Sequence, residues 1–166
     1  MQTLVAVAGL PGVGKTTVSA AVAERLGATR LRSDVLRKEL FDAPDYRPEE
    51  TEAVYAELRE RAADLLAEGE SVVLDATFRE GSRRDRVAAV AEANGAAFRF
   101  VHVTCADEVV RERIAAREGD ASDADVAVYE QLKGEFEPVE REHVRIDNSG
   151  TLAETDAQVE RAFSAE

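Results

Sequence analysis

A glycine-rich segment near the amino end, Gly9-Leu10-Pro11-Gly12-Val13-Gly14-Lys15-Thr16, has the spacing G-x-x-x-x-G-K-[ST]. It follows the apolar run 4–8, which is typical of a strand buried on both faces, and it precedes apolar residues at helical spacing. Glycines between a strand and a helix let successive backbone N–H groups converge on phosphates at the positive end of the helix. The pattern predicts a nucleotide-phosphate site from Gly9 to Thr17.

Two side chains of this motif predict how a nucleotide is held, with ATP and Mg²⁺ as the expected cofactors. Lys15 would reach the β- and γ-phosphates, and the hydroxyl of Thr16 would bind Mg²⁺. Asp75 ends the apolar run 71–75 and is a second candidate for the Mg²⁺ shell. The alternative is that Asp75 only caps the segment that follows.

Asp34 is a candidate for contact with a second substrate. It follows the short predicted strand 29–32 and lies in the first turn of a predicted helix. An acid there is also favoured by the helix dipole, by about 0.3–1 kcal/mol, so a purely structural role is the alternative. Arg37 lies one helical turn further on, where it could bind an anionic acceptor or pair with Asp34 or Glu39.

Further arginines are candidates for contact with substrate or with transferred phosphate. Arg113 and Arg117 are four residues apart, so they project from one face of a predicted helix. Their alternative role is to pair with nearby acids on an exposed helix, each pair contributing about 0.3–0.5 kcal/mol. Arg83 lies in a stretch with three other arginines, a pattern that fits a solvated basic face.

Predicted strands and helices alternate along the chain, which favours a parallel sheet with helices on both faces. In such sheets ligands bind beyond the carboxyl ends of strands, where Asp34 and Asp75 both lie. We expect one domain over 1–166. Strands are expected at 4–8, 29–32, 71–75, 98–103 and 144–147, and helices before Gly27, from Ser33 to Leu40, from Pro48 to Gly69, from about Ser82 to Asn94, after Asp107, before Pro138 and after Thr151. Ser33 is an expected N-cap, and Thr151-Leu152-Ala153-Glu154 has the form of a capping box.

The composition limits the classes of partner. Asp and Glu exceed Lys and Arg by enough to give a net charge of −13, so the surface repels nucleic acid at long range. Cys105 is the single cysteine, which fits a reducing compartment and excludes a thiolate metal cluster. The start of the chain lacks a basic signal-peptide region, and no apolar run suits a membrane span. We expect a cytoplasmic protein, with its oligomeric state open.

Several of these segments together resemble the zeta-toxin-like and polynucleotide-kinase-like P-loop kinases. The resemblance is greatest to kinase domains of the type fused to aminoglycoside-phosphotransferase-like domains, and it covers nearly the whole chain. It implies a P-loop NTPase three-layer sandwich with a five-stranded parallel sheet in the order 2-3-1-4-5. The segments that carry it are 9–17, Arg32-Ser33-Asp34 with Arg37, 72–78, 113–117 and Ser122-Asp123-Ala124.

The resemblance also implies roles for individual residues. The acid that matches Asp34 orients and deprotonates the acceptor hydroxyl, and the arginine that matches Arg83 contacts substrate. Arg113 and Arg117 match the two arginines of a lid, here about 111–124, that neutralise charge on the transferred group. The segment Phe136-Glu137-Pro138 also matches the family, although no mechanism follows from it.

We therefore expect an ATP- and Mg²⁺-dependent kinase that transfers the γ-phosphoryl group to a hydroxyl of a small-molecule acceptor. A 5′-hydroxyl polynucleotide kinase is the enzymatic alternative, which the acidic surface disfavours. The alternative from another class is a nucleotide-binding switch module without catalysis. The acceptor itself does not follow from the sequence.

Overall fold

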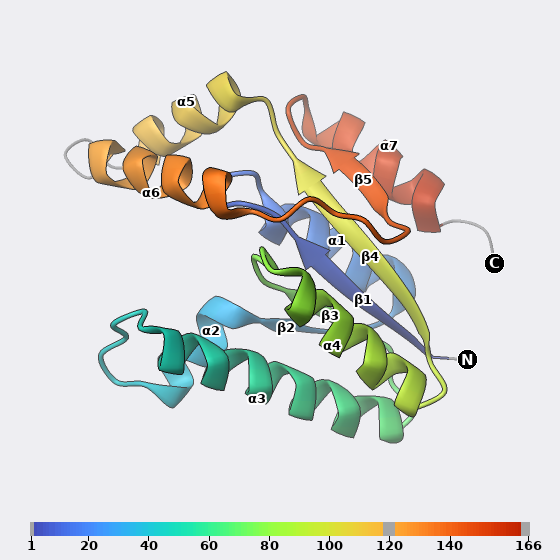
Figure 1. Ribbon diagram of the computed structural model, residues 1–166. Helices are drawn as coiled ribbons and strands as arrows, with labels where there is room; N and C mark the ends of the chain where they lie inside the picture. The colour runs from blue at the N-terminus through green and yellow to red at the C-terminus, as the bar shows by residue number, and fades with distance from the viewer. Residues whose placement is uncertain (1, 118–121, 164–166) are drawn as a thin grey trace.

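The computed structural model describes residues 2–117 and 122–163 as a sheet with helices on both faces (Figure 1). All strand pairs are parallel, and the strand order is β2-β3-β1-β4-β5, so the predicted α/β fold of P-loop NTPases and its 2-3-1-4-5 order are confirmed. The strands are β1 (Thr3–Ala8), β2 (Thr29–Arg32), β3 (Val72–Asp75), β4 (Ala97–Thr104) and β5 (Val144–Asp147). The helices are α1 (Lys15–Leu26), α2 (Ser33–Leu40), α3 (Pro48–Ala67), α4 (Gly81–Ala93), α5 (Asp107–Arg117), α6 (Ser122–Glu135) and α7 (Leu152–Phe163).

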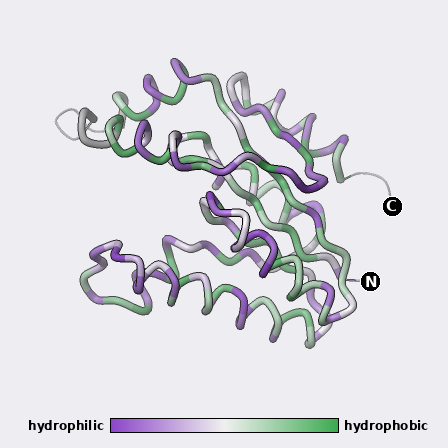
Figure 2. The backbone as a smooth tube through the Cα atoms, in the orientation of Figure 1, coloured by the Kyte–Doolittle hydropathy of each residue, from purple (hydrophilic) through white to green (hydrophobic). Residues whose placement is uncertain are grey.

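The core has two halves, one on each face of the sheet. Leu4, Ala6 and Ala8 of β1 pack with α2, α3 and α4, whereas Val5 and Val7 pack with α1, α5 and α7. Alternate side chains of a strand point to opposite faces, so a strand covered on both sides must be apolar throughout. Figure 2 shows hydrophobic residues concentrated in the central strands, while the outer helices mix hydrophobic and hydrophilic positions.

The register of the strands brings three chain segments to one edge of the sheet. Asp75, at the end of β3, pairs with Val7 of β1 and with Arg32 of β2. The loop after β1, the start of α2 and the loop after β3 therefore leave the sheet side by side. This edge is the one at which parallel sheets bind ligands.

Two local predictions at helix starts had different outcomes. The sequence Thr151-x-x-Glu154 forms the expected capping box, in which the Thr151 N–H donates to Glu154 Oε1 at 2.8 Å and the Glu154 N–H donates to Thr151 Oγ1 at 3.1 Å. Ser33, expected as a cap, is instead the first residue of α2, and Arg32 occupies the cap position. This shift leaves Asp34 in the first turn, as expected.

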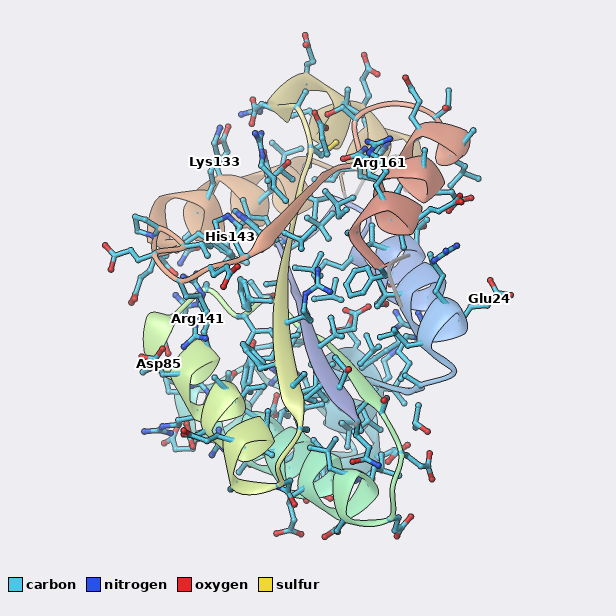
Figure 3. All side chains as sticks on the ribbon, turned by 90° about the vertical axis from the view of Figure 1, so that its right-hand side faces the viewer. Glu24, Asp85, Lys133, Arg141, His143 and Arg161 are labelled. Carbon is cyan, nitrogen blue, oxygen red and sulfur yellow. The ribbon has the colours of Figure 1, made fainter. Side chains whose placement is uncertain are left out.

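Charged side chains cover the outside of the helices. In Figure 3 the charged end of Glu24 projects outward from α1, away from the sheet. Surface pairs also occur, such as Arg141 with Asp85 at 3.0 Å. Within residues 2–117 and 122–163, no helix combines the length and the apolar content that crossing a membrane demands.

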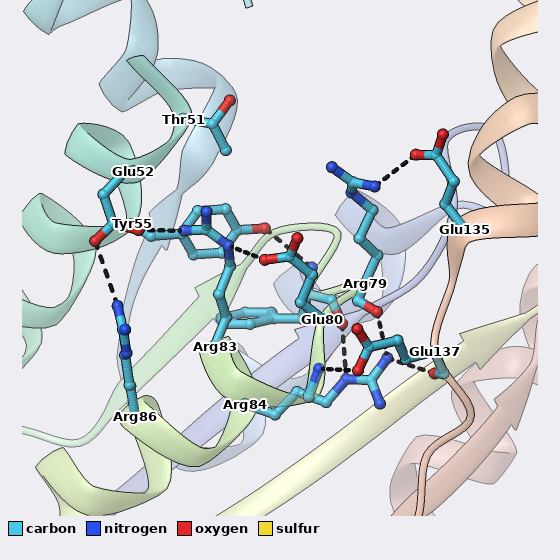
Figure 4. Close-up of polar contacts among 12 residues, drawn as sticks. Thr51, Glu52, Tyr55, Arg79, Glu80, Arg83, Arg84, Arg86, Glu135 and Glu137 are labelled. Atoms are coloured by element: carbon cyan, nitrogen blue, oxygen red, sulfur yellow. Dashed lines mark hydrogen bonds and ion pairs between the residues drawn. The ribbon is translucent and has the colours of Figure 1, made fainter. Parts of the chain in front are cut away.

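Buried Arg84 attaches the segment after α6 to the loop after β3. Its guanidinium donates to the backbone oxygens of Phe78 at 2.8 Å, Glu137 at 2.7 Å and Pro138 at 3.0 Å (Figure 4). In return, the Glu137 carboxylate accepts the N–H of Gly81 at 2.8 Å. These contacts give a structural role to the Phe136-Glu137-Pro138 segment, because they hold the two chain segments against each other.

The turn that Arg84 supports has a strained backbone. Phe78 is fully buried and has a φ of 49°, a left-handed conformation that costs a bulky residue on the order of 1–3 kcal/mol. Its N–H donates to the hydroxyl of Tyr55 at 3.0 Å, and its carbonyl accepts from Arg84. Side chains from α3 and α4 thus hold this turn, which aims Thr77 and Arg79 at the sheet edge.

His102 of β4 predicts a pH dependence of stability. Its ring stacks on Phe136 with centroids 5.1 Å apart, and burial lowers its pKa to about 4, with smaller effects from His143 and Arg84. Between pH 4 and 6.5 the unfolded chain binds more protons, so the free energy of unfolding falls as the pH drops through this window. We expect His102→Gln to flatten this dependence, most visibly above pH 5, in urea unfolding at a series of pH values.

The matched control for this measurement is His143→Gln, since the chain has two histidines and His143 is exposed. Equal flattening by both variants would contradict the assignment to His102.

Candidate functional site

The glycine-rich loop has the backbone conformation that a phosphate site requires. Gly12 and Gly14 have φ of 88° and 93°, in the left-handed region that favours glycine. A Cβ on Gly9 would lie 2.8 Å from the carbonyl oxygen of Val103, so this position is closed to side chains as well. No side chain of the described residues caps the start of α1 at Lys15, which leaves its first N–H groups open to an anion.

Asn148, which directly follows β5, holds the glycine-rich loop in place. Its Nδ2 donates to the carbonyl of Val13 at 2.9 Å, and its Oδ1 accepts from the hydroxyl of Thr155 at 2.5 Å. The side chain is 6% exposed. Both ends of this amide are therefore used inside the protein, in support of the phosphate loop.

Gly14→Ala tests how closely the loop is packed. An alanine Cβ at this position would overlap Asn148 Nδ2, in addition to the cost of a left-handed backbone. We expect a loss of about 2–4 kcal/mol in the free energy of unfolding, which urea denaturation measures.

Gly27→Ala is the matched control, because Gly27 also has a positive φ, of 62°, yet a Cβ there meets nothing within 4 Å. Backbone strain alone predicts a loss of about 1–2 kcal/mol for this variant. Equal losses in the two variants would show that Asn148 does not restrict the loop.

Lys15 is held in the loop without a strong partner. Its Nζ donates only to the carbonyl of Leu10, at 3.4 Å, among the described residues. Burial lowers the pKa of Lys15, and nearby Asp75 and Asp34 oppose this effect only in part. The ammonium is thus desolvated, and a bound phosphate would compensate for that loss of solvation.

Asp75 and Thr16 are the two residues expected at a metal. Asp75 is 5% exposed and accepts a hydrogen bond from Ser19 at 2.6 Å, and sequence reasoning did not single out Ser19. In the described part of the chain no three His, Cys, Asp or Glu side chains converge as a metal centre. The residues fit Mg²⁺, because this ion is usually bound by one or two protein groups together with phosphates and water.

Asp34 lies on the border between two adjoining cavities. The first, of about 520 Å³, contains the loop residues Gly12, Lys15 and Thr16. The second, of about 730 Å³, extends toward α3 and α6. Both cavities are lined by Pro11, Ser33, Asp34 and Thr77. An exposed carboxylate thus stands where a phosphate cavity meets a separate cavity large enough for a small molecule.

Arg37 lines the second cavity but pairs differently from both expected partners. Its guanidinium lies 2.5 Å from Glu50, in a pair whose side chains are 10% and 6% exposed. Glu50 also accepts the N–H groups of Asp45 and Tyr46, and these bonds with the Arg37 pair lower its pKa to about 2. Of the two alternatives for Arg37, the pairing with Asp34 or Glu39 does not occur, because the start of α3 brings Glu50 to Arg37 instead.

Arg83 also lines the second cavity, and it is not part of a solvated basic face. It is 14% exposed, lies 3.0 Å from Glu80 and 3.2 Å from Glu52, and stacks on the ring of Tyr55 (Figure 4). The third arginine of this cavity, Arg79, pairs with Glu135 of α6 at 2.5 Å.

Arg113 lines the first cavity, beside the loop. Its guanidinium donates to the carbonyl of Asn148 at 2.8 Å and contacts the sulfur of Cys105 at 3.5 Å. Among the described residues, neither Glu108 nor Glu112 forms an ion pair with it. Asp120, the third acid of the pairing alternative, lies outside the described residues. Arg117 ends α5, and its side chain lies outside the described residues, as do the side chains of 122–124.

With the geometry in place, comparison with known proteins identifies the family. The model of an AAA-domain family matches residues 4–139. The chain belongs to this family. This AAA-domain chain is also 31% identical over 159 residues to a Mycobacterium tuberculosis protein described as uncharacterized, covering 89% of the chain and 32% of that protein. The chain therefore spans about a third of the length of this curated relative.

Solved structures share the fold of this AAA-domain chain. It is similar to a sugar kinase from Janibacter, with a TM-score of 0.74 at 20% identity over 99% of the chain and 94% of that structure. A gluconokinase from Sinorhizobium meliloti has a TM-score of 0.72 at 23% identity, covering 95% of this chain and 89% of that structure. An APS kinase from Mycobacterium tuberculosis, solved with AMPPNP and APS, has a TM-score of 0.75 at 19% identity, covering 99% of this chain and 98% of that structure. At these identities the likeness is one of fold.

The structure thus brings most of the predicted site residues of this AAA-domain chain to one edge of the sheet. Lys15, Thr16, Asp75 and Arg113 line the first cavity, Arg37 and Arg83 line the second, and Asp34 lines both. Sequence reasoning assigned no role to the side chain of Arg32, which also lines the first cavity. The sequence held a signal for this residue, because Arg32 ends β2 and lies two residues before Asp34.

Proposed function

We propose that this protein is a P-loop kinase of the zeta-toxin-like and polynucleotide-kinase-like group. It transfers the γ-phosphoryl group of ATP to a hydroxyl of a small-molecule acceptor in a Mg²⁺-dependent reaction. The observation that carries this proposal is the position of Asp34 between the two cavities. A carboxylate there can hold a hydroxyl of one ligand in line with the terminal phosphate of another, which phosphoryl transfer requires.

In this proposal each site residue has a separate role in phosphoryl transfer. The backbone amides of 9–17 and the ammonium of Lys15 bind the phosphates, and Asp34 accepts the proton of the attacking hydroxyl. Thr16 and Asp75 would hold Mg²⁺, which neutralises charge on the phosphates when bound. Arg113 and Arg117, on a lid of about 111–124, stabilise charge on the transferred group, and Arg37 and Arg83 contact the acceptor.

Three further points belong to the same proposal. The chain acts as one catalytic domain over 1–166, in the cytoplasm, without nucleic acid as its substrate. The names of the similar structures support a small acceptor, since they include a sugar kinase and a gluconokinase. The relative from Mycobacterium tuberculosis is about three times as long as the matched region, and we propose the same kinase activity for a longer protein that contains such a domain.

The test combines binding with turnover. Calorimetry with ATP and Mg²⁺ first measures nucleotide binding by the purified chain. γ-Labelled ATP is then offered with sugars, sugar acids, nucleosides, aminoglycosides and 5′-hydroxyl oligonucleotides, with no acceptor as the control. Labelling of a small molecule supports the proposal, labelling of oligonucleotides alone favours a polynucleotide kinase, and binding with no stimulation by any acceptor favours a switch module.

A further inference from the structure

The arginines of the two cavities differ in their partners. Each arginine of the second cavity lies within 4.0 Å of a glutamate, namely Arg37 with Glu50, Arg79 with Glu135, and Arg83 with Glu52 and Glu80. Among the described residues, no carboxylate pairs in this way with the cations of the first cavity, which are Lys15, Arg32 and Arg113. Asp34 and Asp75 also line the first cavity, but its three cations outnumber these two carboxylates, which in a chain of net charge −13 favours an anionic ligand.

Arg32 is the member of this trio that has no assigned role. It ends β2, opposite Asp75 of β3, and its Nη2 donates to the hydroxyl of Thr16 at 3.0 Å. Its Nε is buried and has no hydrogen-bond partner in the described residues. The positive charge of Arg32 also contributes to the lowered pKa of Lys15, after the larger effect of burial. An unpaired N–H donor on the Arg32 guanidinium and a desolvated ammonium on Lys15 both lower stability. A bound anion would compensate for both costs.

We propose that Arg32 binds the terminal phosphate of the nucleotide, an inference that rests on the proposed function. Thr16, which Arg32 contacts, is the expected ligand of the Mg²⁺ that bridges the β- and γ-phosphates. Asp34, two residues further on, is the expected contact of the acceptor hydroxyl. Arg32 therefore lies between the metal side and the acceptor side of the site, where the γ-phosphate must be. Its fork of N–H donors suits phosphate oxygens.

The experiment measures nucleotide affinity by calorimetry with Mg²⁺, using AMPPNP, which carries the terminal phosphate, and ADP, which lacks it. We expect Arg32→Gln to weaken AMPPNP binding about 10–100-fold, the range for hydrogen bonds to charged groups, and to change ADP affinity less than about 3-fold. Unchanged AMPPNP affinity, or equal losses for AMPPNP and ADP, would overturn the proposal.

Arg30→Gln is the matched control. Arg30 is on the same strand and also contacts α1, through the carbonyl of Thr16 and the hydroxyl of Ser19, but it does not line the first cavity. We expect its affinity for AMPPNP to equal that of the unmodified chain. An equal loss in Arg30→Gln would show that contacts between β2 and α1, rather than a phosphate bond, explain the effect.

A second variant keeps the test decisive if Arg32→Gln folds poorly. Arg32→Lys retains the charge but lacks the planar fork, so it should bind AMPPNP more tightly than Arg32→Gln and more weakly than the unmodified chain, with urea unfolding as the check of folding. Full affinity in Arg32→Lys would overturn the assignment of the fork to phosphate. If the unmodified chain binds neither nucleotide, the proposed function itself fails, which is a different result.

Discussion

Replacing Lys15 by alanine is expected to abolish phosphoryl transfer while leaving the fold intact. The ammonium contacts the glycine-rich loop at the carbonyl of Leu10 and would meet the β- and γ-phosphates, so its loss removes binding and charge stabilisation together. We expect the rate with any identified acceptor to fall by at least about 10³-fold, as for other groups that stabilise developing charge. Labelled ATP measures this effect, and calorimetry reports the accompanying loss of nucleotide affinity.

The same variant makes a less obvious prediction about stability. Burial lowers the pKa of Lys15, which means that the folded protein holds the charged form less favourably than water does. Removing the ammonium is therefore expected to leave the melting temperature unchanged or to raise it. Lys38→Ala, at an exposed lysine of α2, is the control and should keep full activity. An active Lys15→Ala protein, or one that loses activity by unfolding, would contradict this account.

Asp34→Asn is expected to keep nucleotide binding and lose transfer. Asparagine retains the size and a hydrogen-bonding oxygen of Asp34 but cannot accept the proton of an acceptor hydroxyl. General-base catalysis of this kind contributes about 10²–10⁴-fold, so we expect the rate of transfer to fall by a factor of that size. The affinity for ATP should change by less than about 2-fold. The loss of an acid from the first turn of α2 should cost at most about 1 kcal/mol of stability.

Glu39→Gln is the matched control, because Glu39 is another exposed acid of the same helix. Its carboxylate pairs with Arg61, and Glu39 lines neither cavity. It should transfer phosphate at the unmodified rate. If Asp34→Asn retains most of its rate with a matched acceptor, Asp34 only positions the acceptor, and another group must take the proton.

The two cavities are built by different parts of the fold, which bears on how such a protein could change substrate. The first is formed by the loop after β1, by residues at the ends of β2 and β3, and by Arg113 of α5. The second is closed by α3, α6 and the turns around Tyr46 and Arg79. Substitutions in these outer segments can reshape the acceptor cavity without touching the phosphate loop.

The sequence predicted the parts of the site that depend on local chain geometry. The motif 9–16 is readable because its glycines and its place between a strand and a helix are properties of consecutive residues. Asp34 and Asp75 could be placed at one edge because parallel strands all end on the same side of a sheet. The capping box at Thr151 is local for the same reason.

The partners of the charged side chains could not be predicted in this way. For Arg37 the sequence left open an anionic acceptor or a pair with Asp34 or Glu39, its neighbours in the chain, and it did not indicate Glu50, with which Arg37 pairs. The support of Val13 by Asn148, 135 residues away, and of Phe78 by Arg84 depends equally on packing.

Local residue types therefore determined the phosphate loop, the order of elements and the edge at which they meet. The tertiary structure decided which cations of the two cavities pair with glutamates and which do not. The physical reason is the short range of the interactions. A hydrogen bond or ion pair forms only when two groups come within about 3–4 Å, and for groups on separate elements that distance is set by the packing of the whole core.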